Sequence, residues 1–380
     1  LGMPTDEAAA GAVATAGQAV VFAGGTVVVS ILGLAVAGIP FLTAAGIAIS
    51  FVVLIMVAGS ITLVPALLAL AGGWINRLGL RTLRRRGEAR TGNRKGWERW
   101  GAHVSKHAVA YAVGTTVVLL AMAAPVLSLR LGVPDDGTLP ESRTERRAYD
   151  LVADGFGPGT NGPLVIAVDI SRDVSVLEPL AAAVAADPGI ASVAPPDVDL
   201  EAGVAAIVAI PTTAPQDAAT RATVERLRAE VFPPVLRGHD ALAHVGGYTA
   251  NFTDLADRVQ DRLLLFIAAV IVLSFVLLMI VFRSILVPLK AAALNLLSIG
   301  AAYGVLVMVF QWEWGADLIG LEAAVPIVAF IPMLMFAIVF GLSMDYEVFL
   351  LSRVREHYLA THDNDAAVVH GLASTARVIT

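Results

Sequence analysis

Six apolar segments, each long enough to cross a lipid bilayer as a helix, constrain the fold of this chain more than any other feature of its sequence. A spanning helix needs about 20 consecutive apolar residues, and six segments reach this length: 19–39, 44–72, 108–129, 263–282, 285–310 and 323–344. Only 15% of the residues are charged, whereas a soluble domain carries about 25%. The sequence therefore predicts a polytopic α-helical membrane protein with six spans.

The two long connections between these spans differ in charge, and this difference predicts the orientation of the chain. Residues 73–107 contain ten Lys or Arg and two acidic residues, whereas residues 130–261 contain ten Arg and twenty acidic residues. Short loops rich in Lys and Arg remain in the cytoplasm. We therefore expect residues 73–107 to be cytoplasmic and residues 130–261 to be extracytoplasmic, in the plasma (inner) membrane.

Residues 130–261 are too long for an unstructured loop, because such long connections without secondary structure are rare in folded domains. After a first helical pattern at 143–156, the sequence predicts strand, helix, strand, strand, helix and strand at 162–170, 175–187, 189–195, 203–211, 216–232 and 241–247. This βαββαβ order is that of a ferredoxin-like α/β domain. A final helix at 249–261 leads directly into the fourth span, so movement of the domain could reach the membrane.

These patterns divide the chain into nine segments, taken in chain order. They are a cytoplasmic helix (1–17), two spans (18–72), a basic cytoplasmic linker (73–107), one span (108–129), the extracytoplasmic domain (130–261), two spans (262–310), an external loop (311–322), a span with an acidic motif (323–352) and a cytoplasmic segment (353–380).

The two ends of the chain resemble each other, which suggests an internal repeat. TDEAAAGAVATAGQAVV (5–21) aligns without gaps on NDAAVVHGLASTARVIT (364–380), and Asp6 then matches Asp365. A chance match between two short Ala-rich helices is the alternative. If the repeat is real, we expect the counterpart of the acidic motif to precede Leu1, as in transporters built from parallel repeats.

An acidic residue in the last apolar segment is the strongest candidate for function. Asp345 lies in the stretch FGLSMDYEVFLLSRVREHY, and a carboxylate inside a bilayer costs on the order of 3 kcal/mol. Gly341 shares its helix face and would let another helix approach, while Tyr346 supplies a neutral phenol. Because desolvation disfavours the charged carboxylate, Asp345 could exchange a proton near physiological pH. Alternatively, it caps a helix end near Arg353 and Arg355.

Other polar residues near this motif have weaker patterns. Asn295 and Ser298 lie one turn apart in the fifth span and are possible polar partners of Asp345, although bonds between packed helices explain them equally. Glu347 lies two residues beyond Asp345 and is expected to face a different environment, with a structural role. Lys290 is near the inner end of its span, where a lysine extends its ammonium group to the membrane surface.

The sequence contains no sign of enzymatic chemistry or of a cofactor. It has no cysteine, which excludes disulfides and thiolate metal sites. His103 and His107 have i,i+4 spacing, but no nearby acid or cysteine completes a metal site. Phosphate-binding loops and nucleophile elbows are missing from the sequence as well. We therefore expect no catalytic residues, no metal, no cofactor and no nucleic-acid partner.

The stretch GLSMDYEVFLLSRVREHY resembles the signature of the mycobacterial membrane protein large (MMPL) family, within the resistance–nodulation–division transporters. The external LPESRTERRAYDLVADGFGPGTNGPLVIAVD and the membrane segment SITLVPALLAL are similar to that family too. The resemblance implies that residues 130–261 form a porter domain. It also implies that Gly341, Asp345 and Tyr346 are one G-x-x-x-D-Y motif, whose Asp–Tyr pair relays protons. A second such pair, from a missing first repeat or a second copy, is expected to complete the relay.

Together, the residues and the resemblance predict a secondary transporter that uses the proton gradient to export lipids or other hydrophobic compounds, drugs included. Two alternatives remain at this point. One is a Sec-type accessory factor that uses proton flow in protein export. The other is a lipid- or sterol-sensing membrane protein that binds its ligand without pumping it.

Overall fold

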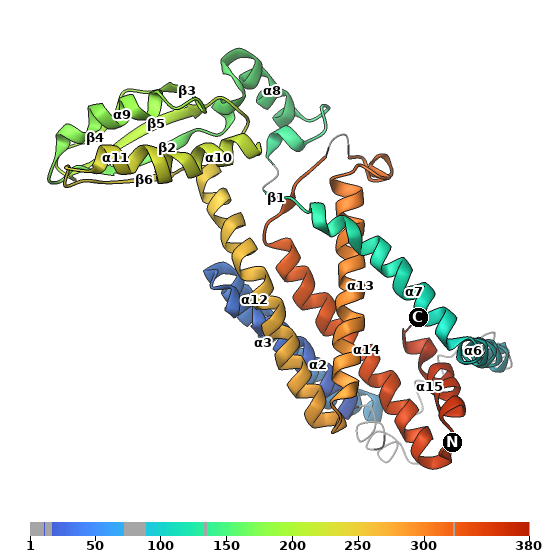
Figure 1. Ribbon diagram of the computed structural model, residues 1–380. Coiled ribbons are helices and arrows are strands. Elements are labelled where there is room, and N and C mark those ends of the chain that lie inside the picture. Colours follow the sequence, from blue (N-terminus) through green and yellow to red (C-terminus); the bar gives the residue numbers. More distant parts are fainter. Residues whose placement is uncertain (1–10, 12–16, 72–88, 133–134, 322–323, 380) are drawn as a thin grey trace. The chain divides into compact units, whose positions relative to one another are not determined.

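The structure is a computed structural model, which describes residue 11 and residues 17–71, 89–132, 135–321 and 324–379 (Figure 1). Most of the cytoplasmic helix predicted at 1–17 and the arginine-rich part of the predicted linker lie outside these residues. The chain forms two compact units. The membrane unit comprises Leu1–Ala124, Arg262–Gly304 and Pro332–Thr380, and the outer unit comprises Pro125–Asp261 and Val305–Ile331.

Within the described residues, six helical segments are long and apolar enough to cross a membrane, which confirms a multi-pass membrane protein. They are α2 (Gln18–Leu32) with the 3₁₀ turn η2 (Gly33–Ala37), α3 (Pro40–Ala71), α7 (Ala108–Ala123) with η4 (Ala124–Ser128), α12 (Tyr248–Phe282), α13 (Leu286–Phe310) and α14 (Ile331–Thr361).

Two tight hairpins join consecutive spans. Between α2 and α3, Gly38 adopts a positive φ of 65°, a conformation that costs glycine little. The two helices then pack closely, since a Cβ on Gly24 would lie 2.1 Å from Cγ2 of Val57. Between α12 and α13, Arg283 takes the corresponding positive φ of 50°. Both hairpins occur where the sequence predicts them.

The last span begins later and ends later than the apolar pattern predicts. The predicted span starts at residue 323, whereas α14 begins at Ile331. Strand β7 (Ile327–Val328) precedes it and pairs in parallel with β1 (Leu131–Gly132). The amide of Ala329 donates to the carbonyl of Gly132 at 3.2 Å. A continuous apolar run does not distinguish such a buried strand from a helix, which explains the difference.

Two further helices pack together within the membrane unit: α6 (Ala89–Lys106) and α15 (Asn364–Ile379). A Cβ on Gly101 of α6 would lie 3.4 Å from Cα of Val369 on α15. The Ser105 hydroxyl donates to Asp365 Oδ1 at 3.0 Å. The predicted linker 73–107 is therefore helical from residue 89, and the predicted segment 353–380 consists of the end of α14 followed by α15.

The outer unit contains a small antiparallel sheet with helices packed on it (Figure 1). Its strands are β2 (Leu164–Asp169), β3 (Ile190–Val193), β4 (Asp197–Asp199), β5 (Val204–Pro211) and β6 (Leu242–Gly246). Its helical elements are η5 (Asp136–Thr138), α8 (Thr144–Phe156), η6 (Pro158–Asn161), η7 (Val174–Val176), α9 (Leu177–Ala185), α10 (Ala218–Arg226), the π-helical turn η8 (Leu227–Val231), α11 (Phe232–Leu236) and η9 (Ala316–Ile319).

The strands lie in the order β3-β5-β2-β6, and every neighbouring pair is antiparallel. β4, which the sequence does not predict, pairs with β5 off this path. Alternate residues of β2 and β5 are buried, as expected for a sheet with one covered face. Side chains of α9, α10 and α11 complete this core, which includes Leu164, Ile166, Leu180, Val184, Ile207, Val224 and Phe232.

A buried ion pair joins α10 to the turn before β3. Arg226 donates from Nε and Nη2 to the two carboxylate oxygens of Asp187, at 2.7 and 2.5 Å. The Asp187 side chain is 2% exposed, and its Oδ1 also accepts from the amide of Gly189 at 2.8 Å. The hydrogen bonds from Arg226 lower the pKa of Asp187 below its ordinary value. This pair stabilises one end of the outer core.

Candidate functional site

The acidic motif lies in the middle of α14, where Gly341, Asp345 and Tyr346 occupy one helical stretch. The i,i+4 spacing places Gly341 and Asp345 on the same face of the helix. For Asp345 the structure describes the backbone and leaves the side chain outside its description. The residues that pack around Gly341 describe the surroundings of this helix face.

Helix α2 packs directly against Gly341. A Cβ at this position would lie 3.1 Å from Cα of Val27 and 3.6 Å from Cβ of Ser30, and Gly341 is buried. Close approach at small residues is how membrane helices gain packing energy without a hydrophobic driving force between them. The glycine thus brings α2 next to the face of α14 that carries the motif.

Buried hydroxyl groups line the α2 side of this contact. Thr26 and Ser30 are both fully buried on α2, and the Thr26 hydroxyl donates to the carbonyl of Ala23 at 2.7 Å. Ser274 of α12 is also buried and lies one turn from Val270, which packs on Gly33 of η2, directly after α2. Within the described part of the chain, Ser30 Oγ and Ser274 Oγ have no hydrogen-bond partner. Such groups are costly in an apolar interior.

Asn295 connects α13 to α14 close to the motif. Its side chain is buried, and its Oδ1 accepts a hydrogen bond from the Ser343 hydroxyl at 2.5 Å. Its Nδ2 group has no partner among the described residues. Ser298, the other predicted polar partner, is exposed. Only Asn295 of this pair therefore lies in the interface between α13 and α14.

Tyr346 and Glu347 lie in different surroundings. The Tyr346 side chain is 46% exposed, so α2, α12 and α13 do not enclose its phenol. Glu347 is half-buried, and the charge of Lys290 on α13 acts on its carboxylate. The Glu347 Oε2 atom is itself buried without a hydrogen bond to the described residues. Lys290 of α13 thus acts electrostatically on Glu347 of α14, which the sequence pattern did not indicate.

Sequence reasoning did not single out four hydroxyl residues of this interface: Thr26, Ser30, Ser274 and Ser343. Each is a small polar residue inside an apolar run, a pattern that also suits ordinary surface-facing positions in a helix. Ser343 is close to Asp345 in sequence, but two residues correspond to about 200° around a helix, so a helical wheel places them on different faces. The residues of α2 and α12 cannot be found from such a comparison, because their positions depend on tertiary packing.

The outer unit contains a second candidate site, a cavity of about 690 Å³. Its wall combines the aromatic residues Tyr248 and Phe252, whose rings are 4.4 Å apart, with charged and amide side chains such as Arg130, Arg221 and Gln311. Gln311 is held in place because its side chain accepts from the amide of Arg130 at 3.1 Å and donates to the carbonyl of Arg130 at 2.7 Å. This mixed lining suits an amphiphilic ligand.

Asp135 adds an acidic group to the wall of this outer cavity. Its Oδ1 accepts from the amide of Gly137 at 3.0 Å, whereas its Oδ2 is buried without a hydrogen bond to the described residues. Burial raises the pKa of Asp135 above its ordinary value. Burial also raises the pKa of the nearby Tyr149. Burial in this part of the outer unit therefore disfavours the charged forms of both side chains.

Comparison of the sequence with known proteins identifies a family that matches this chain. The model of the MMPL family matches residues 1–111 and 171–380. Membrane protein YdfJ of Bacillus subtilis is 39% identical over an alignment of 384 residues, which covers 100% of this chain and 51% of YdfJ.

Two mycobacterial relatives are similar over almost the whole chain. The mycolic acid-containing lipids exporter MmpL11 of Mycolicibacterium smegmatis is 33% identical over 388 residues, 100% of this chain and 40% of the relative. The heme uptake protein MmpL11 of Mycobacterium tuberculosis is 35% identical over 377 residues, 97% of this chain and 38% of the relative. The chain thus spans about half or less of the length of the curated relatives it matches.

Proposed function

Since the chain belongs to the MMPL family, we propose that it is part of a secondary transporter that uses the proton gradient to export lipids or other hydrophobic compounds. One observation carries this proposal: the Asp345–Tyr346 motif lies on a membrane helix, and the helix face that Asp345 shares with Gly341 packs tightly against α2 at that glycine. An acidic residue at such a position is by default a functional residue.

The relay we propose works through a change of charge on Asp345. When Asp345 is protonated, its side chain carries no charge, and this face of α14 can pack closely on apolar neighbours. When Asp345 loses its proton, it needs hydrogen-bond donors, and the unpaired Ser30 Oγ is a donor on the Gly341 side of α14, the face that carries Asp345. The two charge states therefore favour different packings of α14 and α2. Tyr346 would assist by exchanging a proton, and a second Asp–Tyr helix, from another repeat or copy, would complete the relay.

The outer unit is proposed to be an extracytoplasmic porter domain with a ferredoxin-like fold. Its strand order β3-β5-β2-β6 and antiparallel pairing support this fold, as does the βαββαβ order of its main elements. α12 runs without interruption from Tyr248 to Phe282. A tilt of this helix in the membrane would therefore be transmitted to residues that line the outer cavity, such as Phe252 and Gln260.

The outer cavity and the relatives support an amphiphilic substrate. Aromatic and charged side chains share its wall, so an apolar chain and a polar head could be accommodated together. One relative is named for the export of mycolic acid-containing lipids and another for heme uptake. Both names denote large hydrophobic compounds, and we propose this class of compound as the substrate.

The first test is Asp345→Asn, which keeps the size of the side chain and removes the titratable group. With the protein in proteoliposomes under an imposed proton gradient, export of a fluorescent lipid should fall about tenfold or more, because the proton-exchanging residue is lost. Asp317→Asn, an exposed aspartate of η9, is the matched control and should transport normally.

Undiminished export by Asp345→Asn would refute the relay. Lipid binding without any gradient-dependent movement, in the wild-type protein, would instead favour a sensor. A secretion defect for proteins, with lipid export intact, would favour a protein-export factor.

A further inference from the structure

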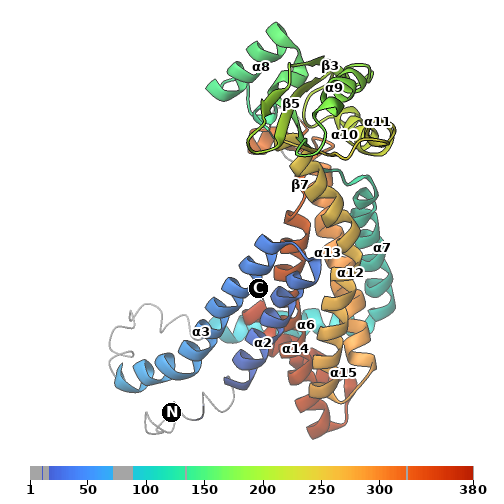
Figure 2. The ribbon, with the colours of Figure 1, turned by 90° about the vertical axis from the view of Figure 1, so that its left-hand side faces the viewer.

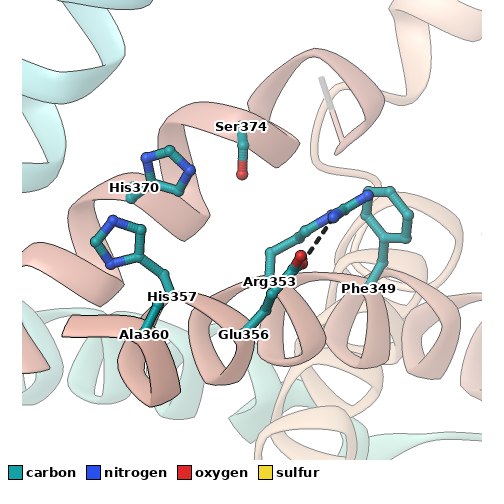
Figure 3. A pocket seen from close by; sticks show the side chains of 7 residues that line it. All are labelled: Phe349, Arg353, Glu356, His357, Ala360, His370 and Ser374. Atoms are coloured by element: carbon teal, nitrogen blue, oxygen red, sulfur yellow. Dashed lines mark hydrogen bonds and ion pairs between the residues drawn. The ribbon is translucent and has the colours of Figure 1, made fainter. Parts of the chain in front are cut away.

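The end of α14 and the start of α15 form a helical hairpin that encloses a second polar cavity (Figure 3). Asp363 caps α15, since its Oδ1 accepts from the amide of Ala366 at 3.0 Å. The two helices approach closely at Gly371, where a Cβ would lie 2.4 Å from Cγ2 of Val354. Beside this contact lies a cavity of about 380 Å³. The positive-inside rule places this end of α14 in the cytoplasm.

Four hydrogen-bond donors line this cavity, two from each helix. Arg353 and His357 lie one turn apart on α14, and His370 and Ser374 lie one turn apart on α15. Figure 3 shows the side chains of the two helices facing each other across the space. The rings of His357 and His370 stack with their centroids 4.4 Å apart. A guanidinium, two imidazoles and a hydroxyl are the groups that bind phosphate oxygens in proteins.

The hydrogen-bond donors of the cavity remain available for an anion. Glu356 pairs with Arg353 at 2.8 Å, but the two side chains are 69% and 45% exposed, and exposed ion pairs contribute at most about 1 kcal/mol. Arg353 therefore keeps donors available for a ligand. The imidazole groups of His357 and His370 and the hydroxyl of Ser374 add donors for the same anion.

A metal ion fits this site less well than an anion. The two imidazole planes are inclined by 26° in a stacked arrangement, so their nitrogen lone pairs do not converge on one point as tetrahedral coordination requires. No group of three or more His, Asp or Glu residues in the described part of the chain could hold a metal ion.

The position of the cavity favours a phosphate group carried by a lipid. Phe349 lines its membrane end, and the Arg353 guanidinium lies over the Phe349 ring, 5.8 Å from its centroid. Basic residues just beyond the cytoplasmic end of a span attract the anionic headgroups of that leaflet. We propose that this cavity binds the phosphate of an anionic phospholipid headgroup. The bound lipid links α15 to the helix that carries Asp345.

The test compares lipid binding by two neighbouring arginines. The protein is reconstituted in phosphatidylcholine nanodiscs and titrated with short-chain phosphatidylglycerol, and bound lipid is counted by native mass spectrometry. Arg353→Gln and His370→Gln should each weaken binding about tenfold, the loss expected for one charge-assisted contact. Arg355→Gln should change it less than twofold, because Arg355 does not line the cavity. Arg353 and Arg355 are both exposed, so folding should be unaffected.

Two outcomes would overturn the proposal. Equal weakening by Arg353→Gln and Arg355→Gln would mean that the basic surface attracts lipid without a site. Full retention of binding by the double variant Arg353→Gln/His370→Gln would exclude the cavity. Inorganic phosphate distinguishes the source of the anion: if phosphate displaces the lipid only at far higher concentration, the lipid assignment is supported. If phosphate binds as tightly as phosphatidylglycerol, the site takes soluble phosphate and the lipid assignment fails.

Discussion

At the residue scale, two ion pairs of the outer unit show how burial decides the contribution of a charge. Arg226 and Asp187 form a two-pronged bond at a carboxylate that is 2% exposed. Arg172 and Asp240 have a similar distance of 2.8 Å, but both side chains are 71% exposed. Removing one partner of a buried pair leaves an uncompensated charge, whereas an exposed pair is hydrated and screened.

Asp187→Asn should therefore lower the stability of the outer unit by about 3 kcal/mol, since it leaves the Arg226 guanidinium without its carboxylate. Asp240→Asn is the matched control, and a change of less than about 1 kcal/mol is expected for this exposed pair. Urea-dependent pulse proteolysis of the outer unit measures both values. Equal effects of the two substitutions would contradict the role assigned to burial.

Two carboxylates, Asp187 and Asp173, predict how acid affects the stability of the outer unit. Arg226 lowers the pKa of Asp187, and the hydroxyl of Ser175 and the ring of His239 lower the pKa of Asp173 to about 2 from 3.8. A carboxylate whose pKa is lowered on folding stabilises the fold above its ordinary pKa and loses this contribution as the pH falls. Stability should therefore decrease between pH 3.8 and about 2. Asp173→Asn should make this decrease shallower in acid-unfolding curves.

At the element scale, glycines decide how closely the membrane helices approach. α13 packs on the end of α7 at Gly304, where a Cβ would lie 1.7 Å from the carbonyl oxygen of Met122 (Figure 2). The same arrangement occurs at Gly341 against α2 and at Gly371 against α14. In each place a backbone or a branched side chain occupies the space that a methyl group would need.

Gly304→Ala should separate α13 from α7 and destabilise the membrane unit by about 1–3 kcal/mol, the usual cost of overpacking. Gly114→Ala in α7 is the matched control, because nothing lies within 4 Å of its Cβ position, and alanine has the higher helix propensity. Thermal unfolding in detergent should show a lower Tm for Gly304→Ala and an unchanged or higher Tm for Gly114→Ala. A loss of the same size in both variants would show that the contact with Met122 is unimportant.

At the scale of the whole molecule, the chain consists of two compact units with separate cores. The core of the outer unit includes Leu164, Ile166 and Ile207, all fully buried. The core of the membrane unit includes Phe266 and Phe336, whose rings are 5.6 Å apart. α12 contributes residues to both units without a break. The stability of each unit should nevertheless depend mainly on its own core.

Ile207→Ala should lower the stability of the outer unit by about 2–4 kcal/mol, as expected for a fully buried isoleucine. Val204→Ala, on the exposed face of the same strand, should cost less than about 1 kcal/mol. Hydrogen–deuterium exchange should show faster exchange of the β2 and β5 amides in Ile207→Ala, with the α2 amides unchanged. A parallel loss of protection in α2 would mean that the two units unfold together.

The sequence by itself determined the features that depend on local pattern. The length of each apolar run specified the six spans, and short apolar runs between turn residues specified β2 and β5, because the number of consecutive apolar residues is a property of the segment itself. The position of Asp345 in a membrane helix follows from the same reasoning. The family resemblance carried by GLSMDYEVFLLSRVREHY is likewise a local feature.

Only the tertiary structure decided which segments meet. The pairing of Ile327 with Leu131 converted the start of an apolar run into a strand. The bond between Asn295 and Ser343 selected one of two equivalent polar residues as the link to α14. The stacking of His357 on His370 brings polar residues of α14 and α15 together around one cavity. Each of these contacts depends on residues from another segment of the chain, and local periodicity contains no information about that partner.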